Sequence, residues 1–166
     1  MLPAVQALIK HYGLTPLPVE GTLHAGTWRA PAGRASASAM VGLYCDEPLS
    51  LSRFHRLSVD EVWHFYGGDA LRLVLLHADG RSEDIILGPD PLAGQRVQFI
   101  VPAHTWQAGH MVAGGRYALF GCTLAPGFSP ELFEGGARDV LLARYPGRRG
   151  DILALACEPG HTRMPV

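Results

Sequence analysis

The sequence predicts an all-β domain whose helices are confined to its two ends, and three observations favour this fold class. The 20 glycines and 13 prolines among 166 residues leave little uninterrupted helix and favour short strands joined by turns. From Ala37 to Ala125, several short strand-like runs follow one another with turn residues between them, as in an antiparallel sandwich or barrel. No strand–helix–strand alternation occurs, which argues against a parallel Rossmann-type sheet.

The N-terminal part begins with a predicted amphipathic helix over the first thirteen residues, MLPAVQALIKHYG. Its apolar residues, among them Val5 and Ile9, recur at roughly helical spacing, and Gly13 stands where a helix C-terminal glycine belongs. The next stretch is rich in proline and glycine. It predicts extended chain with one edge-like strand near Thr22–Arg29, followed by a turn at Pro31–Gly33.

The middle of the chain carries the strand pattern. Its best-marked hairpin is LRLVLLHADGRSEDIIL, in which Asp79-Gly80 lies between two apolar runs and readily adopts the positive φ angles of a tight turn. The predicted strands are Ala37–Cys45, Leu51–Leu57, Val62–Tyr66, Leu71–His77, Ser82–Leu87, Val97–Val101, Trp106–Val112 and Tyr117–Leu124.

A helical pattern returns near the C-terminus. Ala137–Arg144 and Arg148–Ala156 flank Pro146-Gly147 and carry leucines that can pack on the barrel. With 48% hydrophobic residues, a chain of this length has enough apolar side chains for one core. We therefore expect a single domain over residues 1–166, with a barrel core over about 37–125 and a helical tail over about 131–157.

Composition argues against several functional classes. A formal net charge of −1 does not suit a protein that binds nucleic-acid phosphates. The three cysteines, Cys45, Cys122 and Cys157, are far apart and odd in number, so a disulfide scaffold or zinc knuckle is disfavoured and a reducing compartment fits best. No cationic leader pattern and no membrane-length apolar run occurs. We expect a cytoplasmic protein with no nucleic-acid or membrane partner.

Polar residues suited to chemistry concentrate in the strings SRFHRLSVDEVWHFYGGD and VPAHTWQAGH, which together resemble the paired motifs of the cupin superfamily. FHRLSVDEVWHFYGGD, VPAHTWQAGH and YALFGCTLAPGF are also similar to signature stretches of the cupin-5 family, a group of small bacterial and fungal cupins of uncharacterised function. Both ends of the chain resemble that family's ends, although Glu20-Gly21-Thr22 stands where the family tends to have Glu-Gly-Gly. The resemblance implies a double-stranded β-helix, the cupin jelly-roll barrel, with an interior pocket and commonly a homodimer.

The superfamily motifs also bear on metal binding. Iron or manganese in cupins usually takes three His and one Glu. Here His55 and Glu61 occupy the first His and the Glu positions, Leu57 replaces the second His, and Gln107 replaces the His of the second motif. Leucine cannot ligate a metal and an amide oxygen is a weak ligand, so we expect no metal cofactor. The alternative is a divalent metal held by His55, Glu61 and Gln107.

His55 and Glu61 remain candidates for catalysis. A carboxyl inside an apolar barrel has its charged form disfavoured, which raises its pKa toward the range useful for proton transfer. A neighbouring His55 could orient Glu61 or share its proton. The alternative is that both residues position a ligand by hydrogen bonding without chemistry.

Strand parity divides the residues after Glu61 between two faces. Trp63 and Phe65 share the face of Glu61 and are candidates to stack a planar or cyclic ligand, although ordinary core packing is the alternative and is favoured for Phe65. His64 and Tyr66 face the other way, where with Val62 they offer a surface for a dimer contact. Gln107 is assigned to the pocket because it occupies a ligand position of the superfamily motif.

These inferences favour a cupin that binds a small molecule and acts as a metal-independent enzyme of the isomerase, epimerase or cyclase kind. Its acid/base pair would be His55 and Glu61, and its ligand-binding residues Trp63, Phe65 and Gln107. Two alternatives remain open: a non-catalytic ligand-binding cupin, and a metal-dependent oxygenase or lyase with a degenerate site. The sequence does not identify the substrate.

Overall fold

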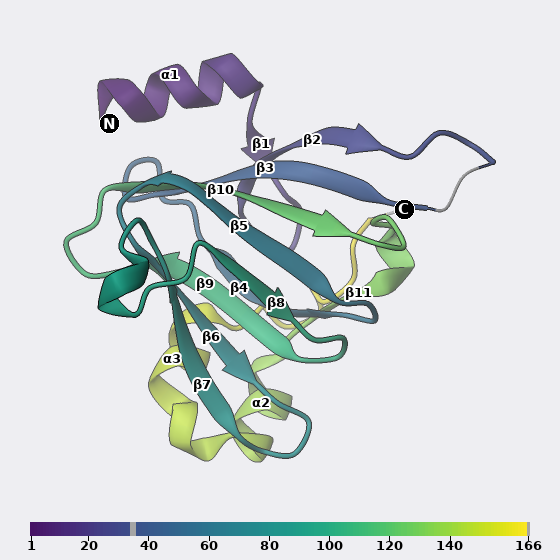
Figure 1. Cartoon of the computed structure of the whole chain (residues 1–166). Helices are drawn as coiled ribbons and strands as arrows, with labels where there is room; N and C mark the ends of the chain where they lie inside the picture. Colours follow the sequence, from purple (N-terminus) through teal and green to yellow (C-terminus); the bar gives the residue numbers. More distant parts are fainter. Residues whose placement is uncertain (34–35, 166) are drawn as a thin grey trace.

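The strands of residues 1–33 and 36–165, which the computed structural model describes, form two antiparallel sheets (Figure 1). The six-stranded sheet has the order β1 (Thr15–Pro16), β2 (Leu23–Arg29), β3 (Ser38–Cys45), β10 (Tyr117–Leu124), β5 (Glu61–Gly68) and β8 (Gln98–Val101). The five-stranded sheet has the order β11 (Phe133–Gly135), β4 (Ser52–Leu57), β9 (Trp106–Met111), β6 (Leu71–Leu76) and β7 (Ser82–Leu87). From β3 onward successive strands alternate between the sheets except at the β6–β7 hairpin, and the predicted all-β class is confirmed.

The main core fills the space between the two sheets. Tyr44, Trp63 and Phe120 from the six-stranded sheet meet leucines of β6 and β7. The Phe120 ring stacks on Trp63, with centroids 4.7 Å apart, and tilts against Tyr44 at 4.6 Å. Gly42 on β3 leaves room for Phe120, because a Cβ at that position would lie 2.5 Å from Phe120 Cε2. A close-packed aromatic cluster therefore fixes the distance between the sheets near the candidate site.

Helices cover the outer faces of both sheets. Helix α1 (Pro3–Tyr12) ends at Gly13, whose φ of +63° is the left-handed conformation expected at a helix C-terminus. Its Val5 packs on the outer side of the six-stranded sheet against Leu23 and Leu43. Helices α2 (Arg138–Arg144) and α3 (Arg149–Leu155) pack on the other sheet, where they join the cluster Phe54, Val74, Leu76, Trp106, Ala108, Leu141, Tyr145, Ile152, Leu155 and Ala156. Short 3-10 helices occupy Pro91–Ala93, Pro130–Leu132 and Pro146–Arg148. Every helix in the described ranges falls short of the length and apolarity that crossing a membrane requires.

The predicted elements agree closely with those observed. All eight strands predicted between Ala37 and Ala125 occur, with ends shifted by two residues at most. The hairpin at Asp79-Gly80 joins β6 to β7, and of this pair Gly80 has the positive φ, +90°. β1 and β11 were not predicted, because strands of two and three residues are too short to display alternation. β1 pairs only with Leu23 and His24, so most of β2 is an edge strand, as expected.

Candidate functional site

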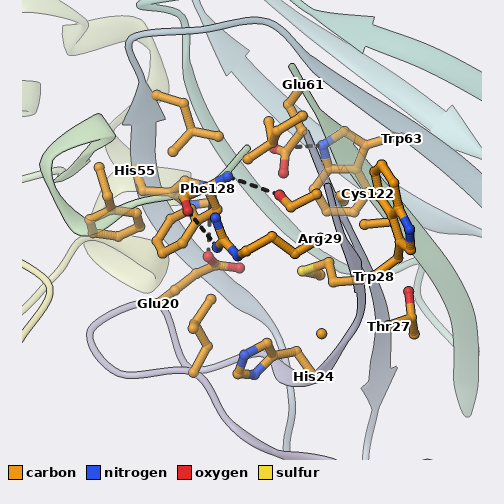
Figure 2. Close-up of a pocket in the computed structure, with 18 residues that line it drawn as sticks. Glu20, His24, Thr27, Trp28, Arg29, His55, Glu61, Trp63, Cys122 and Phe128 are labelled. Atoms are coloured by element: carbon orange, nitrogen blue, oxygen red, sulfur yellow. Dashed lines mark hydrogen bonds and ion pairs between the residues drawn. The ribbon is translucent and has the colours of Figure 1, made fainter. Parts of the chain in front are cut away.

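A cavity of about 500 Å³ opens between the two sheets and is lined by residues from both of them (Figure 2). Much of its wall is apolar or aromatic. Its buried polar residues are Glu20, His55 and Glu61, with exposed fractions of 7%, 3% and 7%. The lining also includes residues of β2 and of β11, outside the stretch of about 37–125 expected to form the barrel core. The side chains that line the cavity are Leu17, Glu20, His24, Thr27, Trp28, Arg29, Ser38, Ala39, Met40, His55, Leu57, Glu61, Trp63, Cys122, Leu124, Phe128 and Phe133.

Glu61 begins β5 and points into this cavity (Figure 2). Its Oε2 accepts hydrogen bonds from Gln107 Nε2 at 2.7 Å and from Trp63 Nε1 at 3.1 Å. Burial raises the pKa of Glu61 above its ordinary value of 4.5, and the nearby His55 only partly opposes this rise. A carboxyl with a raised pKa and one oxygen anchored by two donors is suited to exchange a proton through the other oxygen.

Gln107 lies behind Glu61 rather than on the cavity wall. It is 2% exposed on β9, directly opposite His55 on β4. Its Oε1 accepts a hydrogen bond from Trp63 Nε1 at 3.0 Å while its Nε2 donates to Glu61. The structure therefore brings Glu61, Trp63 and Gln107 into one hydrogen-bonded group, in which Gln107 holds the carboxyl in place instead of facing the ligand space.

His55 faces the cavity with one ring nitrogen. Its Nδ1 lies 2.9 Å from the carbonyl oxygen of Arg53 and therefore carries a proton, which leaves Nε2 as an acceptor in the neutral ring. The ring stacks on Phe133, with centroids 5.2 Å apart and planes inclined by 13°. His55 Nε2 lies 3.7 Å from Glu20 Oε2. The Arg53 carbonyl thus fixes the tautomer of His55, and the stacked Phe133 ring fixes the direction in which Nε2 points.

Glu20 is a candidate site residue that sequence reasoning did not assign. Its Oε1 accepts hydrogen bonds from Thr22 Oγ1 at 2.6 Å and Ser52 Oγ at 2.7 Å, and Ser52 in turn accepts one from the Tyr44 hydroxyl. Burial raises the pKa of Tyr44 well above its ordinary value, so this hydroxyl remains a donor. The sequence signal that could have identified Glu20 is the resemblance of Glu20-Gly21-Thr22 to the family's Glu-Gly-Gly.

Phe65 shares the inward face of β5 but does not line the cavity. It packs instead against the main core beside Tyr44 and Phe120, two residues further along the strand than Trp63. On the outer face, His64 Nε2 lies 3.0 Å from Thr123 Oγ1, and the ring of His64 stacks parallel to that of Tyr66 with centroids 6.3 Å apart. Parity therefore assigns the faces correctly, but position along the strand decides which residues reach the cavity.

The donor set does not suit a metal ion. Leu57, at the second His position of the superfamily motif, is an apolar part of the cavity wall. The amide of Gln107 is engaged at both ends by Trp63 and Glu61. Among the described residues, no three His, Cys, Asp or Glu side chains gather closely enough to hold a metal. The residues His55, Glu61 and Gln107 therefore do not fit the metal alternative.

Two antiparallel sheets of this order, with an apolar cavity between them that contains a few buried polar residues, define the chain as a small cupin. It belongs to the cupin-5 family: residues 6–135 match the family model described as Cupin superfamily (DUF985). The fold is therefore the cupin jelly roll expected from the sequence. No curated protein matches the chain.

Solved structures support this assignment. A crystal structure of a protein from Shewanella oneidensis is 31% identical, with a TM-score of 0.82, over 94% of this chain and 98% of that one. A hypothetical protein from Leishmania major is 25% identical, with a TM-score of 0.80, over 92% and 98% of the two chains. Oxalate decarboxylase from Bacillus subtilis, in a mutant form, is 12% identical with a TM-score of 0.53, and 92% of this chain covers 40% of that enzyme. This last likeness concerns the fold alone.

Proposed function

We propose that this cupin binds a small molecule with a planar or cyclic apolar part and moves a proton on it without a metal, as isomerases, epimerases and cyclases do. The observation that carries the proposal is the arrangement around Glu61. Its Oε2 is anchored by Gln107 and Trp63, no N–H or O–H donor among the described residues bonds to its Oε1, and burial raises its pKa. Such a carboxyl is better suited to give and take a proton than one whose pKa keeps its ordinary value.

His55 supplies a second proton-exchanging group in the same cavity. Since its Nδ1 proton is committed to the Arg53 carbonyl, Nε2 is the nitrogen that can accept a proton from a ligand. The imidazolium so formed would lie beside Glu20 Oε2, at 3.7 Å, whose negative charge would stabilise it. With one group as base and the other as acid, a proton can leave one atom of the ligand and return to another, which is the chemistry of isomerisation and epimerisation.

The apolar wall would orient the ligand. Leu57, Phe128 and Phe133 line the cavity with Trp63, whose ring stacks on Phe120 behind it. A volume of about 500 Å³ lies within the range of small-molecule sites. Exclusion of water by this wall would strengthen each electrostatic contact made inside.

Deuterium incorporation tests the proposal without a defined substrate. Protein would be incubated in D₂O with a bacterial small-molecule extract, and mass spectrometry would identify compounds that gain one mass unit at carbon. We expect incorporation with the wild type and with the control Glu158→Gln, which changes an exposed glutamate, and none with Glu61→Gln. Absence of any protein-dependent incorporation would refute the catalytic proposal.

A non-catalytic binding role is the second candidate. The observation in its favour is that Gln107 and Trp63 both donate to Glu61, because donors of this kind stabilise the carboxylate as a fixed acceptor for a ligand. In that case a ligand retained through purification would be recovered chemically unchanged after prolonged incubation in D₂O. Any deuterated form of that ligand would contradict this candidate.

A further inference from the structure

We propose that the ligand of this cavity is an organic cation, an ammonium group attached to a flat or cyclic apolar body, with the ammonium held between Glu20 and Glu61. The inference names the substrate class of the site described above and rests on the proposed function for the position of the ligand. It is carried by the charges, the unused acceptors and the aromatic wall of the cavity.

The two carboxyls reach the cavity from different parts of the fold. Glu20 precedes β2, Glu61 begins β5, and Figure 2 shows them on opposite sides of the ligand space. Each is 7% exposed and each has one oxygen committed to protein donors: Glu20 Oε1 to Thr22 and Ser52, and Glu61 Oε2 to Trp63 and Gln107.

The remaining oxygens are free for a ligand. Among described residues, neither Glu20 Oε2 nor Glu61 Oε1 accepts a hydrogen bond from an N–H or O–H group. His55 Nε2 lies 3.7 Å from Glu20 Oε2. The thiol of Cys122, a weak donor, lies close to the Glu61 carboxyl. Glu20 and Glu61 both line the cavity, where an ammonium group would offer these oxygens three N–H donors and a positive charge.

Arg and Lys side chains do not supply this positive charge, and His55 supplies it to Glu20 only when its ring is protonated. Among the described residues that line the cavity, Arg29 is the one Arg or Lys, and its side chain extends from β2 toward Phe128 (Figure 2). Its Nη2 already donates to the carbonyl oxygen of Phe128 at 2.6 Å. An anionic ligand group placed at depth would face two carboxyls, so the site disfavours carboxylates and phosphates there.

The wall matches the rest of such a ligand. Trp28, Trp63, Phe128 and Phe133 all border the cavity, and aromatic faces attract both apolar rings and ammonium groups. A metal cation would need three or more suitable donors in one place, and the described residues offer no such group. The aromatic wall and the two separated carboxyls therefore favour an organic cation over a metal.

Isothermal titration with matched probes tests the inference on the wild-type protein. The probes are tryptamine, phenethylamine and cyclohexylmethylamine, each compared with the alcohol and the carboxylate of the same skeleton. We expect at least one ammonium probe to bind about tenfold more tightly than its alcohol, and its carboxylate to bind more weakly still. Equal affinities, a preference for the carboxylates, or no binding by any ammonium probe at about 5 mM would overturn the inference.

Variants locate the effect. Glu20→Gln and Glu61→Gln should each reduce the ammonium-to-alcohol affinity ratio about tenfold, whereas Glu158→Gln should leave it unchanged. Retention of the full ratio in both folded cavity variants would contradict the proposed position of the ammonium. Deuterium incorporation without an ammonium preference would overturn this inference alone, and an ammonium preference without incorporation would overturn only the catalytic proposal.

Discussion

Replacing Gln107 with leucine measures how much its hydrogen bond to Glu61 stabilises the fold, and whether that contribution depends on the charge of Glu61. Gln107 donates to Glu61 Oε2 at 2.7 Å and is 2% exposed, so water cannot readily take its place. A hydrogen bond to a charged group contributes about 1.5–3 kcal/mol, and one between neutral groups about 0.5–1.5 kcal/mol. Trp63 Nε1 still donates to Glu61 after the change, so the carboxyl keeps one partner.

We therefore expect Gln107→Leu to lower the free energy of unfolding by about 1.5–3 kcal/mol where Glu61 is ionised, and by about 1 kcal/mol where it is protonated. The assay is urea unfolding followed by circular dichroism at a series of pH values from about 4.5 upward. Gln6→Leu, at an exposed position of α1, is the matched control and should change little at any pH of the series. An equal loss at every pH of the series would refute the coupling of Gln107 to the Glu61 carboxylate.

Four further predictions concern the same molecule. Because burial raises the pKa of Glu61 above 4.5, the folded protein should lose stability as the pH rises from that value through the folded-state pKa. Glu61→Gln should abolish this loss, so at about pH 8 the variant should unfold at a higher temperature than the wild type. Phe133→Ala, which removes a side chain 1% exposed that stacks on His55, should lower the free energy of unfolding by about 3–5 kcal/mol in urea titrations. Metal analysis of protein purified without chelator should find iron, manganese, nickel and zinc well below one equivalent, and stoichiometric metal would contradict the donor-set argument. The homodimer stays a prediction: light scattering should give twice the chain mass, and Tyr66→Glu, on the outer sheet face where Tyr66 is 55% exposed, should shift it toward the monomer.

The strands could be predicted because their pattern is local. Short strand-like runs with turn residues between them mark the eight central strands, and Gly13 and Gly80 occupy turn positions that their neighbours define. β1 and β11 could not be predicted, since their existence depends on pairing with Leu23–His24 and with His55–Leu57 rather than on their own sequence. Local pattern thus determines long elements, and tertiary pairing determines short ones.

The same distinction between local pattern and tertiary pairing applies to the candidate site. Parity on β5 places Glu61 and Trp63 on one face, whatever the other strands do. The pairing of His55 with Gln107 is a register between strands far apart in sequence, which composition cannot reveal. Glu20 reaches the cavity because the backbone N–H of Arg53 donates to its carbonyl at 2.9 Å and so fixes the N-terminal loop beside β4. That contact joins two distant segments of the chain through the fold alone.

The placement of Glu61 argues for a role beyond folding. A carboxyl beside Leu57, Leu124 and Cys122 is destabilising in its charged form, and an apolar residue would fill the same space without that penalty. Gln107 and Trp63 reduce the penalty through one oxygen only, and the other oxygen is left toward the cavity. The protein neighbours of the second oxygens are weaker: the Cys122 thiol lies by the Glu61 carboxyl, and His55 Nε2 lies 3.7 Å from Glu20 Oε2. Two carboxyls that face one cavity from opposite sides, each with one firmly bound oxygen, therefore support the proposal that a ligand occupies this cavity.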